Sequence, residues 1–366
     1  KLKLPHYLDA LQYCHFPSSH DYDVSNELFE RGRQRFIVEE LLAYKLILKD
    51  AKKKFELNKS AKYSILDVNI NRFIESLPFA LTQSQLNAIN DIKTSFEKPF
   101  PTKRLVQGDV GSGKTIIAAI ASLYATSSKL QVAFLVPTEI LADQHTKTFK
   151  NIFSDLPINI SCLKSKLQPK EKKSILSSVA DGKIDILVGT HSLIEKNVVF
   201  KNLGLVIIDE QHKFGINQRI KISSNNVKDL HPHEIYLSAT PIPRSLSLVL
   251  YEGLDYTTIN HMPSGRKPII TQLVRADDKE DLYRDIQNIL DSNNQIYWVC
   301  SCIDFTETLE TEYVTNQFEI LSGKFADFKI GILHGRNDPK ENKMNMNLFV
   351  KGDIDILVCT TMIEVG

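Results

Sequence analysis

Three short segments of the chain have residue types and an order that suit phosphate chemistry. Residues 108–115 read GDVGSGKT, residues 205–212 read LVIIDEQH and residues 235–240 read IYLSAT. A glycine-rich loop ending in Lys and Thr can wrap its backbone around phosphates. A buried strand ending in two acids can hold a cation and a water molecule. In this order, each at the end of a β-like run, the segments predict a motor that hydrolyses ATP.

The loop residues have separable roles. The glycines of the loop let the backbone approach the phosphates. The backbone amides of the loop lead into a helix N-terminus that favours anions. Lys114 would reach the β- and γ-phosphates, and the Thr115 hydroxyl would ligate Mg²⁺. We expect a strand at residues 104–107 and a helix at residues 116–123. The predicted cofactor-binding residues of the loop are Gly108, Asp109, Val110, Gly111, Ser112, Gly113, Lys114 and Thr115.

The two acids follow a continuous apolar run at residues 205–208, as expected for a strand buried on both faces of a parallel sheet. Asp209 would hold Mg²⁺, and Glu210 would orient and deprotonate the attacking water. Taken alone, the acids could be a solvated pair at a strand end. A phosphate-binding loop upstream in the same sheet favours the catalytic interpretation.

The composition limits which classes of protein the chain can belong to. The chain has 366 residues, 42% of them hydrophobic, and a net charge of +1, so charge gives no argument for or against nucleic acid. No run of apolar residues reaches transmembrane length, and the first residues do not resemble a signal peptide. The five cysteines and ten histidines show no metal-ligand spacing. We therefore expect a cytoplasmic protein with no membrane partner.

An internal repeat predicts the domain organisation. Residues 184–190 read IDILVGT and residues 354–360 read IDILVCT. The second half repeats the strand–helix rhythm, with strands expected at 295–300 and 329–333 and helices at 278–290 and 339–349. We predict an α/β protein with two tandem doubly wound parallel-sheet domains and ATP in the cleft between them.

The predicted boundaries are a helical segment at residues 1–70, a first domain at 71–260 and a second at 261–366. The linker is expected at residues 262–268 (MPSGRKP). Residues 28–55 have apolar side chains at helical spacing and end in the lysine run 52–54, which predicts a long amphipathic helix. The lysines favour a solvated helix end over a DNA-binding patch.

Seven motifs in this order resemble the RecG branch of superfamily 2 helicases. They are GDVGSGKT, LVPTEILADQ (135–144), GTH (189–191), DEQHKFG (209–215), SATPIPR (238–244), LHGR (333–336) and TTMIEVG (360–366). Residues 4–17 are also similar to the segment that joins the family's DNA-binding wedge domain to its motor. Transcription-repair coupling translocases share several motifs, but Gln211 and Ser238 favour RecG.

This resemblance implies RecA-like P-loop domains, ATP and Mg²⁺ as cofactors, and translocation on double-stranded DNA. The family remodels stalled replication forks and migrates branched junctions in DNA repair and recombination. The resemblance further implies branched or forked DNA as a partner, single-strand DNA-binding protein as another, and a monomeric state. An RNA helicase, a transcription-coupled translocase and a nucleotide-binding module without motor activity stay open as alternatives.

The resemblance also extends the site. Phe79 would pack on adenine and Gln85 would read its edge, since residues 77–85 (LPFALTQSQ) resemble the family's adenine-recognising motif. Without the resemblance, Phe79 would be a core residue and Gln85 a residue of the helix surface. Gln211 and His212 join Asp209 and Glu210 in the acidic motif.

Further residues fall in motifs that contact the nucleic-acid backbone or couple hydrolysis to domain movement. The predicted nucleic-acid contacts are Thr138, Gly189, Thr190, His191, Thr360 and Thr361. Each threonine has the alternative role of a strand terminator with a satisfied hydroxyl. The predicted coupling residues are Ser238, Ala239 and Thr240, with hydrogen bonds expected from Ser238 and Thr240 to residues 209–212.

One departure from the family pattern concerns the ends of the sequence. The family's final arginine-containing motif does not occur before Gly366, and no wedge domain precedes Lys1. We therefore expect a fragment of a longer protein. Arg336 is the first candidate to supply an arginine to the transferring phosphate, whereas Arg244 and Arg266 have no assigned role.

Overall fold

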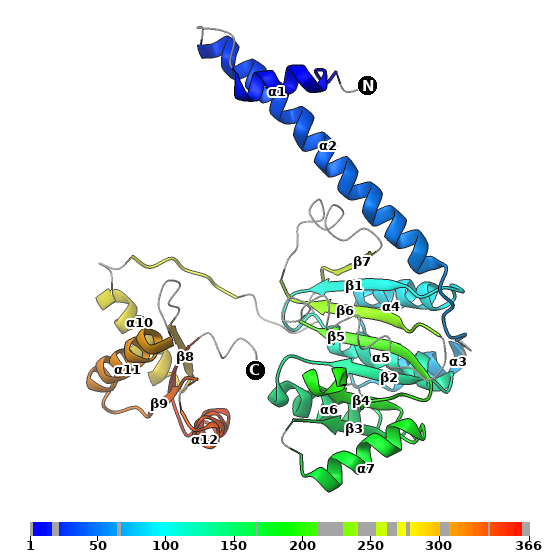
Figure 1. The fold of residues 1–366 in the computed structure, drawn as a ribbon. Helices are drawn as coiled ribbons and strands as arrows, with labels where there is room; N and C mark the ends of the chain where they lie inside the picture. The colour runs from blue at the N-terminus through cyan, green and yellow to red at the C-terminus, as the bar shows by residue number, and fades with distance from the viewer. Residues whose placement is uncertain are drawn as a thin grey trace. The chain divides into compact units, whose positions relative to one another are not determined.

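Parallel β-sheets organise both units of the computed structural model, Lys1–Arg266 and Lys267–Gly366 (Figure 1). The residues that the structure describes are 3–16, 22–63, 67–165, 167–195, 197–210, 230–240, 254–261, 269–275, 279–300, 307–335 and 337–360. The predicted linker at 262–268 lies outside these residues, as do Gln211, His212, Arg244, Arg336 and Thr361.

The first unit holds a seven-stranded sheet in the order β3-β4-β2-β5-β6-β1-β7, and all of its strand pairs are parallel. The strands are β1 (Lys103–Gly108), β2 (Gln131–Leu135), β3 (Ile160–Leu163), β4 (Ile186–Gly189), β5 (Leu203–Asp209), β6 (His233–Ser238) and β7 (Leu254–Ile259). Since β5, β6 and β1 are neighbours, the three segments predicted to do chemistry end at one edge of the sheet.

Helices bury both faces of this sheet. They are α4 (Gln83–Phe96), α5 (Lys114–Ser127), α6 (Glu139–Ile152), α7 (Pro169–Ala180) and the 3₁₀ helix η1 (His191–Ile194). In β5, Leu205 and Ile207 pack with α4, α5 and α6, whereas Val206 and Ile208 pack on the opposite side with α7 and η1. All four side chains are buried, so the apolar run is covered on both faces, as predicted.

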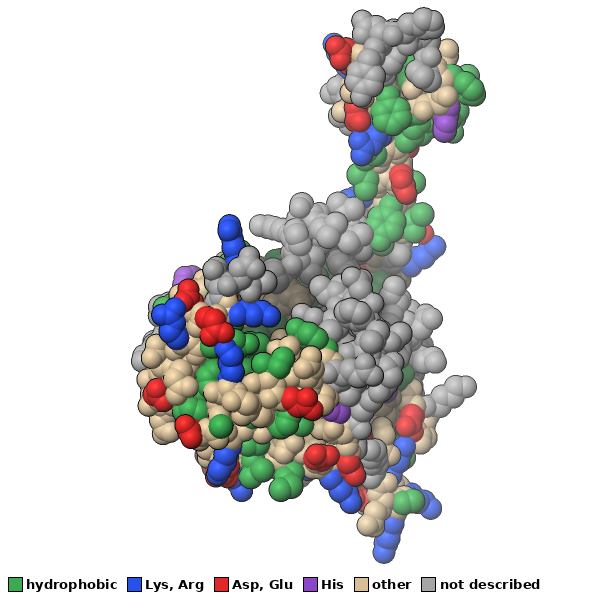
Figure 2. Space-filling view, turned by 90° about the vertical axis from the view of Figure 1, so that its left-hand side faces the viewer, with side chains coloured by type: hydrophobic (Ala, Val, Ile, Leu, Met, Phe, Trp, Pro, Cys, Tyr) green, Lys and Arg blue, Asp and Glu red, His purple; other side chains and the backbone are tan. Residues whose placement is uncertain are grey.

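The N-terminal part of the first unit is helical. It contains α1 (Tyr7–His15), α2 (Tyr22–Glu56) and α3 (Asp67–Ser76). The ring of Tyr7 meets Phe36 edge-on, and a Cβ at Gly32 would lie 2.8 Å from the Ala10 carbonyl, so glycine permits the close crossing of α1 and α2. The long helix is confirmed, but much of its apolar surface is exposed (Figure 2), including Leu41, Leu42, Leu46 and Ile47.

The second unit contains a three-stranded parallel sheet in the order β8-β10-β9. Its elements are α10 (Lys279–Asp291), β8 (Ile296–Cys300), α11 (Glu307–Lys324), β9 (Ile330–Leu333), α12 (Pro339–Lys351) and β10 (Ile356–Thr360). The strands and helices predicted for this half are all present, α11 was not predicted, and the α/β class with parallel sheets is confirmed in both units.

The two units share a local bracing device at matching positions. A glutamine that begins one strand or directly precedes it donates its side-chain amide to two backbone carbonyls. These carbonyls flank the turn before the neighbouring strand. The bonds are Gln131 Nε2 to Val179 O (3.0 Å) and Ile184 O (2.8 Å), and Gln295 Nε2 to Phe349 O (2.5 Å) and Ile354 O (2.7 Å). The repeat seen in the sequence is therefore also a repeat of side-chain contacts.

Candidate nucleotide-binding site

The glycine-rich loop connects the end of β1 directly to the start of α5. Gly111 and Gly113 have φ angles of 79° and 90°, a left-handed conformation that glycine adopts without strain. A Cβ at Gly108 would lie 2.5 Å from Ser112 Oγ, so the loop has no room for one. The start of α5, at Lys114, follows immediately. Loop amides and the helix N-terminus together form a cradle that fits a phosphate group.

Lys114 lies within this cradle. Its Nζ donates to the carbonyl oxygens of Gly108 at 2.6 Å and Asp109 at 3.0 Å. Partial burial lowers the pKa of Lys114, while the carboxylates of Glu210, Asp209 and Asp109 oppose that shift. The ammonium group therefore lies within electrostatic range of the two acids that the sequence predicted beside it.

The acidic pair sits where β5 ends. Both oxygens of the Asp209 carboxylate accept hydrogen bonds: Oδ1 from the backbone N–H of Glu210 at 3.1 Å, and Oδ2 from His145 Nε2 at 3.1 Å. Glu210 has a φ of 48°, which is uncommon for a residue with a side chain. Such conformations cost on the order of 1–3 kcal/mol and concentrate at functional sites.

Oxygen donors at this edge fit Mg²⁺. Thr115 offers a hydroxyl at the start of α5, and each Asp209 oxygen keeps lone pairs beyond the hydrogen bond that it accepts. Mg²⁺ commonly binds through one or two protein oxygen ligands together with substrate phosphates, so Thr115 and Asp209 fit this ion.

Gln85 connects the loop to α4. It is 2% exposed, its Nε2 donates to Ser112 O at 2.8 Å, and its Oε1 accepts the Thr82 backbone N–H at 2.8 Å. The Thr82 hydroxyl in turn accepts the Gln85 N–H, which completes a capping box at the start of α4. Gln85 is therefore not the helix-surface residue that it would be without the family resemblance. Sequence reasoning did not anticipate its contact with the loop.

Phe79 lies a few residues before α4 with 52% of its surface exposed. This exposure excludes the alternative role of a core residue. An exposed aromatic ring next to the Gln85 segment is available for stacking.

The predicted nucleic-acid contacts lie at the ends of several strands. Thr138 is the N-cap of α6 and accepts the Leu141 N–H at 3.3 Å. Gly189 ends β4, where a Cβ would lie 2.6 Å from Leu163 O, and Thr190 is buried beside it. His191, which opens η1, is exposed, and Thr360 is buried at the end of β10 in the second unit.

The predicted coupling residues lie at the end of β6 and directly after it. The hydroxyls of Ser238 and Thr240 lie 2.9 Å apart, and the Thr240 N–H donates to Ser238 Oγ at 3.2 Å. Within the described part of the chain these side chains bond each other rather than Asp209 or Glu210. Ala239 lies between them, and the rest of the expected partner segment is outside the described residues.

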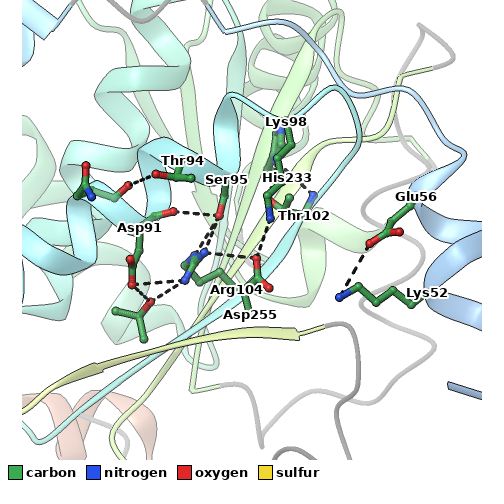
Figure 3. Close-up of polar contacts among 12 residues, drawn as sticks. Lys52, Glu56, Asp91, Thr94, Ser95, Lys98, Thr102, Arg104, His233 and Asp255 are labelled. Carbon is green, nitrogen blue, oxygen red and sulfur yellow. Dashed lines mark hydrogen bonds and ion pairs between the residues drawn. The ribbon is translucent and has the colours of Figure 1, made fainter. Parts of the chain in front are cut away.

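Sequence reasoning missed the buried cation that braces the other end of α4 (Figure 3). Arg104, 9% exposed, donates to Ser95 Oγ at 2.8 and 3.1 Å, to Thr257 Oγ1 at 2.8 Å and to Asp255 at 3.3 Å. Burial lowers the pKa of Arg104, and the carboxylates of Asp255 and Asp91 oppose the shift. An arginine in a short strand gave no sequence signal for this network.

The chain is similar to known proteins over its whole length. The family model for DEAD/DEAH box helicases matches residues 82–249, and that for the helicase conserved C-terminal domain matches residues 281–366. The chain is 40% identical over its whole length to an ATP-dependent DNA helicase RecG of Aquifex aeolicus, covering 46% of that protein. A RecG of Bacillus subtilis is 37% identical, with 100% of this chain and 52% of the relative covered.

A solved structure of RecG bound to a three-way DNA junction superposes with a TM-score of 0.75 at 36% identity, covering 91% of this chain and 43% of that one. The chain belongs to the RecG family. Its two parallel-sheet units are tandem RecA-like domains with the P-loop NTPase fold, and each unit contains one of the two family-model matches. The DNA-bound helicase MrfA, at 19% identity and a TM-score of 0.58, shares the fold. The chain spans about half the length of the curated RecG relatives that it matches.

Proposed function

We propose that the protein containing this chain couples hydrolysis of ATP·Mg²⁺ to translocation on double-stranded DNA. It would act on branched substrates, remodelling stalled forks and migrating recombination junctions. The observation that carries this proposal is the convergence of Lys114, Asp209 and Glu210 at one sheet edge in a chain of the RecG family. A RecG solved with a three-way DNA junction supports the substrate class.

The proposed roles follow from the donor chemistry. Lys114 would leave the loop carbonyls and bind the β- and γ-phosphates, and Glu210 would activate the attacking water. Thr115 and Asp209 would hold Mg²⁺, which neutralises charge on the phosphates. Phe79 would stack on adenine, and Gln85 would read its edge after its side-chain amide leaves the Ser112 carbonyl and the Thr82 N–H.

The nucleic-acid side of the proposal involves Thr138, Gly189, Thr190 and His191 in the first unit and Thr360 in the second. Short hydroxyl side chains and backbone amides at strand ends suit phosphate contacts that carry no sequence information. Ser238 and Thr240 would transmit hydrolysis to domain movement through the acidic motif that follows β5.

The test is ATP turnover of the full-length protein with forked DNA, plain duplex, single-stranded DNA and RNA in parallel. We expect forked DNA to stimulate most and the Lys114→Ala variant to lose turnover, because no second mobile cation among the described residues reaches the loop. Stimulation by RNA alone would favour an RNA helicase. ATP binding without turnover on any nucleic acid would favour a binding module.

Partners and setting are part of the same proposal. We propose the bacterial cytoplasm as the setting, single-strand DNA-binding protein as a partner at forks and a monomeric motor; the bacterial origin of the relatives supports the setting. No helix in the described part of the chain is both long and apolar enough to cross a membrane. Co-migration with fork DNA as a single copy in size-exclusion light scattering tests the monomeric state.

A further inference from the structure

His145 makes a contact at the acidic motif that belongs to none of the sequence motifs considered above. Its Nε2 lies 3.1 Å from Asp209 Oδ2, and the two side chains are 11% and 13% exposed. An ionised carboxylate only accepts hydrogen bonds, so His145 Nε2 carries the proton and donates it. A hydrogen bond to a charged group in so buried a place is stronger than one at the surface.

The imidazole ring is held in place by packing. The centroid of the Phe134 ring, in β2, lies 4.8 Å from the centroid of the His145 ring. On α6, Ala142, Thr146 and Phe149 are buried against the same side of the sheet, so the helix cannot rotate His145 away without exposing them. The donor atom is therefore presented to Asp209 from a rigid element.

The carboxylate is consequently fixed from two sides. Oδ1 is bonded to the Glu210 N–H and Oδ2 to His145, and the two bonds together define the plane of the carboxylate. A partner that orients a metal-binding carboxylate typically changes metal affinity by about 10–100-fold when it is removed. Asp209, at the end of β5, has such a partner in His145, which lies on helix α6.

We infer that His145 is a positioning residue for Mg²⁺: it holds Asp209 in the orientation in which that carboxylate receives the ion. The inference rests on the proposed function, because the role of Asp209 at Mg²⁺ is part of it. Helix α6 also begins at the predicted DNA contact Thr138, so one rigid helix joins that contact to the metal-binding carboxylate.

The experiment compares three substitutions in the full-length protein. His145→Phe keeps a ring beside Phe134 but removes the donor, whereas His145→Gln keeps an N–H donor at a similar reach. His15→Phe makes the same change on the exposed side of α1, outside the site, and serves as the matched control. The readout is the Mg²⁺ concentration that gives half-maximal binding of a fluorescent ATP analogue, followed by the Mg²⁺ dependence of ATP turnover.

We expect His145→Phe to raise the half-saturating Mg²⁺ concentration roughly tenfold or more. Glutamine should restore it to within about threefold, and His15→Phe should leave it unchanged. If the phenylalanine variant does not fold, His145→Asn replaces it, because its shorter amide stops short of Asp209 and the same shift is expected.

Equal Mg²⁺ dependence in the unaltered and donor-free variants would overturn the inference and leave the proposed function standing. An equal shift in the donor-free and glutamine variants would also overturn it, since a purely structural role would give that pattern. If the unaltered protein binds the analogue without any Mg²⁺ dependence, the proposed function and the inference fail together.

Discussion

His233 makes the folding of the first unit sensitive to acid. Its ring is fully buried at the start of β6, edge-on to the rings of Tyr63 and Phe96. Nδ1 accepts the Thr102 backbone N–H at 3.2 Å, so the proton of the neutral ring lies on Nε2 (Figure 3). Burial, with a smaller effect of Lys98, lowers the pKa of His233 from 6.5 to about 3. Protonation would add a buried charge and destroy the acceptor.

The sign and size of this effect on stability follow from the linkage between proton binding at His233 and folding. Between pH 3 and 6.5 the unfolded chain binds a proton at His233 that the folded chain does not, so acid favours unfolding. The neutral ring contributes its full stability above pH 6.5, and this is lost as the pH falls. Between pH 7 and pH 5 the expected loss in the free energy of unfolding is about 2 kcal/mol.

The perturbation that isolates this effect is His233→Asn. The amide oxygen can still accept the Thr102 N–H, but the side chain no longer titrates, so about 2 kcal/mol of the loss between pH 7 and pH 5 should disappear. Urea unfolding followed by far-UV circular dichroism reports both units, and fluorescence of the single tryptophan, Trp298, reports the second alone. His15→Asn, on the exposed part of α1, should keep the wild-type pH dependence.

The reasoning would be refuted if His233→Asn lost as much stability on acidification as the unaltered chain. Such a result would mean that the folded state accommodates a charged imidazole at this position. Overall destabilisation by the substitution does not bear on the argument, because only the change with pH is compared.

Glu210→Gln should leave ATP binding nearly intact and lower kcat at least about a hundredfold, measured as steady-state turnover beside analogue binding, since only the water-activating carboxylate is lost. Gln85→Ala should flatten the preference for ATP over GTP more than it lowers kcat, and equal use of both nucleotides by the unaltered protein would remove its basis. Gly113→Ala should weaken analogue binding about tenfold or more, because its Cβ would lie 2.2 Å from Gln85 Nε2 at a φ of 90°. Arg104→Met should lower the free energy of unfolding by about 3 kcal/mol in urea titrations at pH 7, with Arg104→Lys recovering only part of it; a loss below about 1 kcal/mol would contradict a bracing role.

The elements that carry the site could be predicted from the sequence because their signals are local. The apolar run before Asp209 indicated a doubly buried strand, and glycine spacing indicated the loop before Lys114. Their meeting at one edge then followed from parallel topology, which places carboxyl ends of strands together.

The side-chain partners could not be predicted in the same way. His145 meets Asp209 across 64 residues and Arg104 meets Asp255 across 151, and single residues separated so far leave no periodic signal. The apolar side chains of α2 show a second limit of prediction from sequence. Helical spacing predicted the helix, but spacing does not determine which surface is covered, and Leu42 and Ile47 are exposed.

The glutamine bracing device of the two units separates the mechanical part of the fold from its nucleotide chemistry. Gln131 and Gln295 bond carbonyls at equivalent places in the two sheets, although the sequence contains one GxxxxGKT loop and only the first unit has it. Bracing of this kind is independent of nucleotide chemistry, so the same contact can serve a unit that holds the phosphate-binding loop and a unit that does not. In both units it ties the turn before one strand to the neighbouring strand of the sheet.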